Sequence, residues 1–399
     1  MEDVWISSPI GVVAVLCAVA AFWFVAAQVT EWKLFQYVPP LLFIYATPVF
    51  LNNLDLIPSS GSPVYSGLSE FLLPAFIVLM LIKVNVPAAV RIMGKGVLVM
   101  LMGTAGVVVG GVVSYVIVHR WLAPDAWTGV GALAGSWIGG TGNMAAVSEA
   151  LKTPPEHFGL AVLADNAIYL VWLPILLASK NFADRFNKWT RVPAGRLKMM
   201  DSAAASNLEE ERVPEMRDYL YLAAVAVGVT WLSRLLAAEI FSVMQTNYPA
   251  LQNILNESAW RIFLITTVSL ILSTTRVSRL PNATALGTAM IYVFVAGMGA
   301  RASIEGLAQA PAFLLGAFIW ISIHGGFCLL GAKLFRVDVS SAAIASAANI
   351  GAAASAPIIA AFHRPSLVPV SVLMSLIGYA LGNYLGWVTG HLARVAVGQ

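Results

Sequence analysis

The sequence predicts an all-α polytopic membrane protein, built from two inverted repeats of five transmembrane helices that each carry one re-entrant or broken helix. Apolar residues make up 59% of the 399 residues and charged residues only 11%, whereas soluble domains carry about 25% charged residues. The apolar residues form continuous runs, many of them close to the roughly 20 residues that cross a bilayer as a helix. Shorter alternating strands, which a membrane β-barrel requires, are not the pattern here.

The first repeat is predicted to occupy residues 1–179. It contains five apolar runs, at about 10–28, 35–51, 68–83, 96–118 and 158–179. The chain starts Met1-Glu2-Asp3, without the basic flank of a signal peptide, so we expect the first run to be a retained span. Gly106 and Gly110 in the fourth run have the four-residue spacing that allows close helix packing.

A polar stretch, residues 180–217, separates the halves and is predicted to be a cytoplasmic linker, with basic residues followed by Glu209-Glu210-Glu211. The second repeat is predicted at 218–399. Its apolar runs lie at about 218–240, 259–275, 284–300, 312–332 and 367–389.

Two segments, 130–151 and 340–362, are rich in small and polar residues. Their centres read Gly135-Ser-Trp-Ile-Gly-Gly-Thr-Gly-Asn-Met144 and Ala347-Ala-Asn-Ile-Gly-Ala-Ala-Ala-Ser-Ala356. Each precedes the last apolar run of its half. Glycine-interrupted elements in corresponding positions of two halves are the sequence pointer to the substrate site of a secondary transporter.

The basic residues favour re-entry of both segments over full crossing. If each segment enters and leaves on one side, both termini lie outside, the second half is inverted, and 17 of the 23 Lys and Arg residues fall in cytoplasmic loops. This is the bias of the positive-inside rule, and we expect a multi-pass protein of the inner (plasma) membrane. If both segments cross fully, the halves become parallel and the loop charges alternate poorly. A version with crossing broken helices remains a further alternative.

The small-residue segments supply the candidate substrate site. Glycines cost about 1 kcal/mol each in a helix relative to alanine, and a break exposes amides that need a polar surrounding. The half-helix N-termini would then attract an anionic group. The candidates are Ser136, Gly139, Gly140, Thr141, Gly142 and Asn143 in the first segment, and Ser346, Asn349, Gly351 and Ser355 in the second. The alternative is that small residues only allow helices to cross closely.

A second group of polar residues is predicted to bind the coupling ion. Asp165 and Asn166 lie within the fifth apolar run, and intramembrane ionisable residues are functional candidates by default. We expect them, with Asn349, to bind Na⁺ or a proton, unless Asp165 is hydrated at the interface. His324 is a candidate proton relay or a packing histidine. Tyr379 and Asn383 could line a cavity or pack in the core.

Several motifs together resemble the YjcL-like family of uncharacterised integral membrane proteins. They are Gly135-Ser-x-Ile-Gly-Gly-x-x-Asn143, Ala164-Asp165-Asn166, Ala348-Asn-Ile-Gly351 and Ile377-Gly-Tyr-Ala-Leu-Gly-Asn-Tyr-Leu-Gly386. That family is distantly similar to sodium/glutamate, sodium/citrate and bile-acid symporters and to cation/proton antiporters. The resemblance implies core and scaffold domains, a homodimer and an elevator motion. The family pattern Asn-Ile-Gly-Gly-Pro departs here to Asn349-Ile-Gly-Ala-Ala353, which predicts a less unwound second break.

The sequence therefore favours an ion-coupled symporter of a small organic anion or amino acid. A cation/proton antiporter that uses Asp165 and Asn166 is the first alternative, and a membrane receptor or scaffold without transport is the second. No activated serine, paired carboxylate, zinc spacing or phosphate-binding loop is visible, so we expect neither an enzyme nor a cofactor. We expect a solute, Na⁺ or H⁺, the lipid bilayer and a second copy of the chain as partners, and no nucleic acid.

Overall fold

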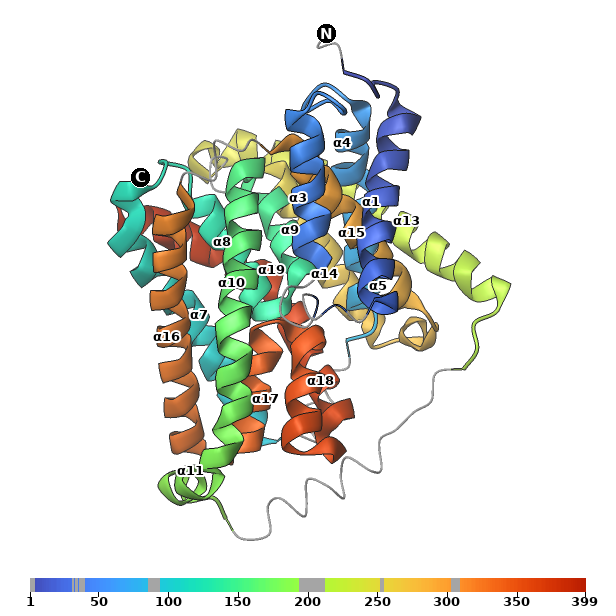
Figure 1. The fold of residues 1–399 in the computed structure, drawn as a ribbon. Coiled ribbons are helices and arrows are strands. Elements are labelled where there is room, and N and C mark those ends of the chain that lie inside the picture. Colours follow the sequence, from blue (N-terminus) through green and yellow to red (C-terminus); the bar gives the residue numbers. More distant parts are fainter. Residues whose placement is uncertain are drawn as a thin grey trace.

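The computed structural model describes residues 4–30, 32, 35, 40–84, 94–193, 212–251, 255–302 and 309–399. Within these ranges the regular structure is entirely helical (Figure 1). In the described part of the chain, eight helices are long and apolar enough to cross a membrane. The protein is therefore a polytopic helical membrane protein, as predicted.

The ten predicted spans correspond to ten helical elements. In the first half they are α1 (Pro9–Val29), α3 (Pro40–Asn53), the continuous helix formed by α4 (Pro63–Gly67), η1 (Leu68–Leu72) and α5 (Leu73–Leu81), α7 (Lys95–Val118) and α10 (Pro155–Ala178). In the second half they are α13 (Met216–Asn247), α14 (Glu257–Ser273), α15 (Ala283–Arg301), α16 (Ala310–Phe335) and α19 (Val368–Ala396). As described, α3 and α14 have only 14 and 17 residues, so they do not satisfy the length of a full span.

The first small-residue segment forms a helical hairpin, which we call hairpin 1. It consists of α8 (Trp127–Gly139) and α9 (Thr141–Leu151), separated by Gly140 alone. Gly131 faces Leu151, Gly135 faces Val147 and Gly139 faces Asn143, so the two helices run antiparallel along each other. The segment therefore enters and leaves at one end of the molecule.

The second small-residue segment forms hairpin 2, from α17 (Val339–Asn349) and α18 (Ala352–His363). Asp338 caps α17 by accepting a hydrogen bond from the Ser341 amide at 2.9 Å. Ile350 and Gly351 separate the helices, one residue more than in hairpin 1. The expectation of a less unwound second break was therefore wrong, since a single glycine with φ of +88° is enough to end the helix.

The two hairpins approach from opposite ends of the molecule, and their tips face each other near its centre (Figure 1). A Cβ placed on Gly140 would lie 3.0 Å from Cβ of Ala352. Both chain ends lie at the end where hairpin 1 starts, and α11 (Ala183–Thr190), which follows α10, lies at the other end. The first described residues of the predicted linker are thus helical. The Glu209-Glu210-Glu211 run lies outside the described residues.

The helices pack into two bundles. The hairpin bundle contains α7, both hairpins, α10, α16 and α19, and its main contacts join α7 to α16 and α8 to α19. The flanking bundle contains α1, α3, α4, α5, α13, α14 and α15. The first three spans of each half build the flanking bundle. The last two spans of each half, together with the two hairpins, build the hairpin bundle.

Glycines at every fourth position hold the hairpin bundle together tightly. Gly135 of α8 lies against Gly386 of α19, where a Cβ on Gly386 would be 2.8 Å from Cα of Gly135. One turn away Gly131 lies against Gly390, with the corresponding distance 3.2 Å. Such small-residue stripes let helix backbones approach closely in membranes, and this contact sets where hairpin 1 sits.

Candidate functional site

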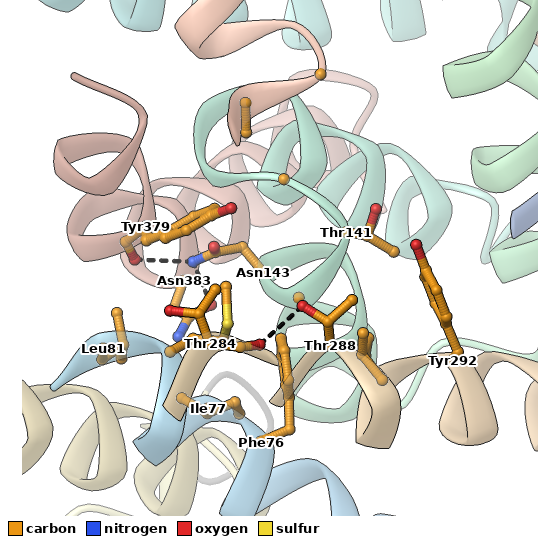
Figure 2. Close-up of a pocket in the computed structure, with 16 residues that line it drawn as sticks. Phe76, Ile77, Leu81, Thr141, Asn143, Thr284, Thr288, Tyr292, Tyr379 and Asn383 are labelled. Carbon is orange, nitrogen blue, oxygen red and sulfur yellow. Dashed lines mark hydrogen bonds between the residues drawn. The ribbon is translucent and has the colours of Figure 1, made fainter. Parts of the chain in front are cut away.

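A cavity of about 300 Å³ lies where the tips of both hairpins meet the flanking bundle (Figure 2). The hairpin bundle contributes the two tips and one face of α19, and the flanking bundle contributes one face each of α5 and α15. The lining residues are Phe76, Ile77, Met80, Leu81, Gly140, Thr141, Gly142, Asn143, Thr284, Thr288, Ile291, Tyr292, Gly351, Ala352, Tyr379 and Asn383. None of these residues carries a charged side chain, so the polar groups of the cavity are amides, hydroxyls and helix ends.

Asn143 is the best-anchored polar group of the cavity. Its Nδ2 donates to Oδ1 of Asn383 at 2.7 Å and to the carbonyl of Tyr379 at 3.0 Å (Figure 2). Asn383 in turn donates to Oγ1 of Thr266 in α14, also at 2.7 Å. This chain of hydrogen bonds runs from the tip of hairpin 1 through α19 to the flanking bundle, and it fixes the orientation of the Asn143 amide.

Steric constraints explain why glycine occupies these positions at the hairpin tips. Gly140 has φ of +88° and ψ of 179°, a conformation essentially limited to glycine. A Cβ on Gly142 would collide with the ring of Phe76, which forms the opposite wall of the cavity. The positions after the breaks are the first residues of α9 and α18, and the first amides of a helix have no partner within that helix. Both tips therefore direct helix N-termini at the cavity.

The flanking bundle contributes polar residues that the sequence reading missed. Thr284, Thr288 and Tyr292 of α15 line the cavity. The residues follow one another at four-residue spacing, and such residues share one face of a helix. A polar stripe at this spacing within an apolar run is the signal that could have identified them.

Asp165 lies outside the cavity lining, between α10 and hairpin 1. Its Oδ1 accepts a hydrogen bond from Nε1 of Trp137 at 2.9 Å, and its Oδ2 accepts one from Oγ of Ser136 at 3.1 Å. Among the described residues, no Lys or Arg forms an ion pair with Asp165. Asp165 thus holds the end of α8, one turn before Gly140, through neutral donors only.

Some of the other predicted site residues line the cavity, and the rest make contacts elsewhere. Gly140, Thr141, Gly142, Asn143 and Gly351 line the cavity. Gly139 packs against Asn143 and the carbonyl of Gly378. Asn166 donates to the carbonyl of Val162 in its own helix at 2.7 Å, and it makes no hydrogen bond to Asp165 within the described residues.

The polar residues of hairpin 2 face helices rather than the cavity. The side-chain amide of Asn349 lies 2.8 Å from Oγ1 of Thr104 in α7. With its oxygen turned to Thr104, its nitrogen also donates to the carbonyls of Ala345 and Met100, so every group is paired. Ser355 bonds to the carbonyls of Ile350 and Ala347, at 2.8 and 3.2 Å, and closes the tip of its own hairpin.

His324 belongs to a buried chain of hydrogen bonds. Its Nδ1 lies 2.9 Å from the carbonyl of Gly103, which requires a donor, so Nε2 accepts from Oγ of Ser346, also at 2.9 Å. Ser346 accepts from Nε1 of Trp172 at 2.9 Å. The chain connects α7, α10, α16 and α17. Neither His324 nor Ser346 lines the cavity, and the contacts of both residues hold hairpin 2 in place.

Comparison with known proteins assigns the chain to a family. Residues 14–395 match the family described as protein of unknown function (DUF819). The chain belongs to the DUF819 family. A curated relative in this comparison is the uncharacterized membrane protein YjcL of Bacillus subtilis (strain 168), which is 25% identical over 396 residues. The match covers 98% of this chain and 97% of YjcL. The expected resemblance to a YjcL-like membrane family is therefore confirmed, and it extends over the cavity and both hairpins.

Proposed function

We propose that this DUF819 protein is a secondary active transporter that moves a small organic anion or amino acid together with Na⁺ or H⁺. The single observation that carries the proposal is the cavity between the bundles, where two hairpin tips converge. Its volume of about 300 Å³ is at the lower end of the range for small-molecule sites, which favours a small solute.

The anionic group of the solute would lie at the hairpin tips. The N-termini of α9 and α18 each supply partial positive charge and first-turn amides without a partner inside their own helix, the arrangement that binds anions in soluble proteins and transporters. Thr141 and Asn143 add side-chain hydrogen-bonding groups at the first tip. The apolar remainder of the solute would face Phe76 and Ile291.

The coupling ion would act through Asp165. A carboxylate at membrane depth that has only neutral donors is costly, and binding of a cation or proton removes that cost. Because Asp165 holds Ser136 and Trp137 one turn before the tip, loading this carboxylate would alter the position of Gly140. Ion binding and solute binding would thus be linked through the end of α8.

Transport would involve motion of the hairpin bundle against the flanking bundle. The cavity lies on their interface, and the two hairpins belong to the same bundle. We propose that the halves are inverted repeats and that the motion is of the elevator type, with the flanking bundle as the scaffold of a homodimer. The clustering of basic residues supports an orientation with the linker in the cytoplasm and both termini outside, which is part of the proposal.

A cation/proton antiporter is the second candidate, and a specific observation favours it. Asp165 has no cationic partner among the described residues and lies outside the cavity, so it could exchange cations without an organic solute. Asn166 supports this candidate less, since its amide nitrogen is bonded within α10.

Uptake into proteoliposomes distinguishes these functions. The purified protein would be tested with imposed sodium or proton gradients and radiolabelled amino acids, dicarboxylates and tricarboxylates. We expect gradient-dependent accumulation of one solute class. Gradient-dependent proton flux without any solute would instead establish the antiporter. The absence of both proton flux and solute uptake would contradict transport.

Asp165→Asn tests the coupling site in the same assay. The change keeps the size of the side chain and removes its charge, so we expect gradient-driven accumulation to disappear while exchange of solute across the membrane persists. Asp184→Asn, at an exposed position on α11, serves as the matched control. Accumulation that survives Asp165→Asn would remove this residue from the coupling mechanism.

A further inference from the structure

A second cavity, larger than the first, lies at the end of the molecule away from α11. Its volume is about 490 Å³. It lies between the two bundles: residues 60–69 and the end of α15 form one side, and residues 148–155, where α9 ends and α10 begins, form the other. Phe294 of α15 lines this cavity, and Tyr292, two residues earlier, lines the first. The N-terminal part of α15 thus lines the first cavity, and its C-terminal part lines the second.

The charged residues that line this second cavity are unbalanced. Lys152 and Arg301 line it with exposed side chains, and neither forms an ion pair within the described residues. Glu149 is the only carboxylate among the lining residues, and its Oε1 lies 3.0 Å from Nη2 of Arg261. Because that pair neutralises Glu149, the lining keeps two positive charges.

Serine hydroxyls make up much of the remaining lining. Six serines contribute, at positions 60, 62, 66, 69, 148 and 258. Ser66 donates to the carbonyl of Pro63 at 3.0 Å and Ser62 accepts from the amide of Val64 at 3.4 Å. Hydroxyls that can rotate to donate, next to two cations, are suited to bind a carboxylate or another oxyanion.

We propose that this second cavity is a binding site for carboxylate-bearing solutes on the face of the protein opposite the linker. Lys152 follows hairpin 1 in the hairpin bundle and Arg301 ends α15 in the flanking bundle, so a bound anion contacts both bundles. The site's role as the place where solute collects before it reaches the first cavity rests on the proposed transport function. Its preference for anions does not depend on that function.

Charged thiol reagents test the preference directly. The native cysteines, Cys17 and Cys328, would be replaced by alanine and a cysteine introduced as Ser66→Cys. Reaction rates would then be compared for the anionic sulfonatoethyl and the cationic trimethylammonioethyl methanethiosulfonates at low ionic strength. We expect Lys152→Gln and Arg301→Gln each to lower the anionic rate about fivefold, as for unit charges about 8 Å apart in an effective dielectric of about 40.

Two controls make the result decisive. Lys152→Arg, which keeps the charge, should retain the original rate. Arg120→Gln removes an exposed charge at the same end of the molecule but outside the cavity, so it should leave the rate unchanged. Equal anionic rates in the parent, Lys152→Gln and Arg301→Gln proteins would overturn the proposal.

The labelling result is independent of transport. If uptake is found, Lys152→Gln should raise KM for the solute several-fold with kcat retained, whereas Asn143→Ala should abolish uptake and leave the labelling rates unchanged. If no solute is transported, the proposed function fails, but the rates of the anionic reagent still decide whether the cavity selects anions.

Discussion

At the scale of single residues, Gly140 is the position on which hairpin 1 depends. Its φ of +88° strains any residue with a side chain, and a Cβ at this position would lie only 3.0 Å from Cβ of Ala352 and 3.1 Å from Cε1 of Tyr379. We expect Gly140→Ala to lower the free energy of unfolding by about 1–3 kcal/mol. Thermal unfolding in detergent would measure this, with Gly326→Ala as the control, because no atom of the described residues lies within 4 Å of the added methyl group. Equal stabilities of the two variants would contradict the geometry of the tip.

The sequence predicted the composition of the first tip, but not the contacts of individual side chains. Gly140, Thr141 and Asn143 were identified because a glycine-rich break in an apolar chain is visible without a structure. The bond from Trp137 to Asp165 and the turning of Asn349 towards Thr104 were not predicted. Both depend on which helices lie side by side, and periodicity along one segment does not contain that information.

At the scale of elements, the base of hairpin 1 is attached to α14 across the interface of the bundles. Glu149 pairs with Arg261 at 3.0 Å, with side chains 22% and 12% exposed, and Asn256 donates to the carbonyl of Ala150 at 3.0 Å. We expect Glu149→Gln and Arg261→Gln each to destabilise the protein, since each leaves a largely buried charge without its partner. The double variant should recover part of the loss.

A double-mutant cycle on thermal unfolding would measure this coupling, which we expect to be about 0.5–3 kcal/mol. The exposed pair of Arg234 and Glu70, at 2.9 Å, is the matched comparison, and its coupling should be smaller because solvent or headgroups screen it. A coupling of zero for Glu149 and Arg261 would mean that the pair does not fasten the hairpin.

At the same scale, the sequence was most reliable for long apolar runs. All ten predicted spans fall on described helices, because continuous hydrophobicity specifies a span without reference to its neighbours. The four-residue spacing of Thr284, Thr288 and Tyr292 predicts that these residues share one face of α15. The spacing does not show that this face lines a cavity, since the same threonines would also suit packing within the membrane.

At the scale of the whole molecule, two bundles enclose one cavity near the middle of their interface and a second towards one end. The first lies at the hairpin tips, and the second lies beside residues 148–155, where hairpin 1 ends and α10 begins. This arrangement explains why small residues recur in corresponding segments of both halves: the hairpins must reach the centre of the molecule and pack closely there. The resemblance implied core and scaffold domains, but the helices that build each bundle could not be predicted, because this depends on contacts between spans distant in the chain, such as α8 with α19.

If the protein transports as proposed, solute passes through the cavity between the hairpin tips. Thr288→Trp tests it most directly, because the larger side chain fills the cavity from α15 without changing either hairpin. Solute uptake into proteoliposomes under the effective gradient would be compared with that of Val227→Trp, at an exposed position on α13. We expect at least a tenfold loss of uptake for Thr288→Trp, a barrier increase of about 1.4 kcal/mol or more, and full activity for Val227→Trp. Undiminished uptake by a stably folded Thr288→Trp protein would contradict passage through this cavity.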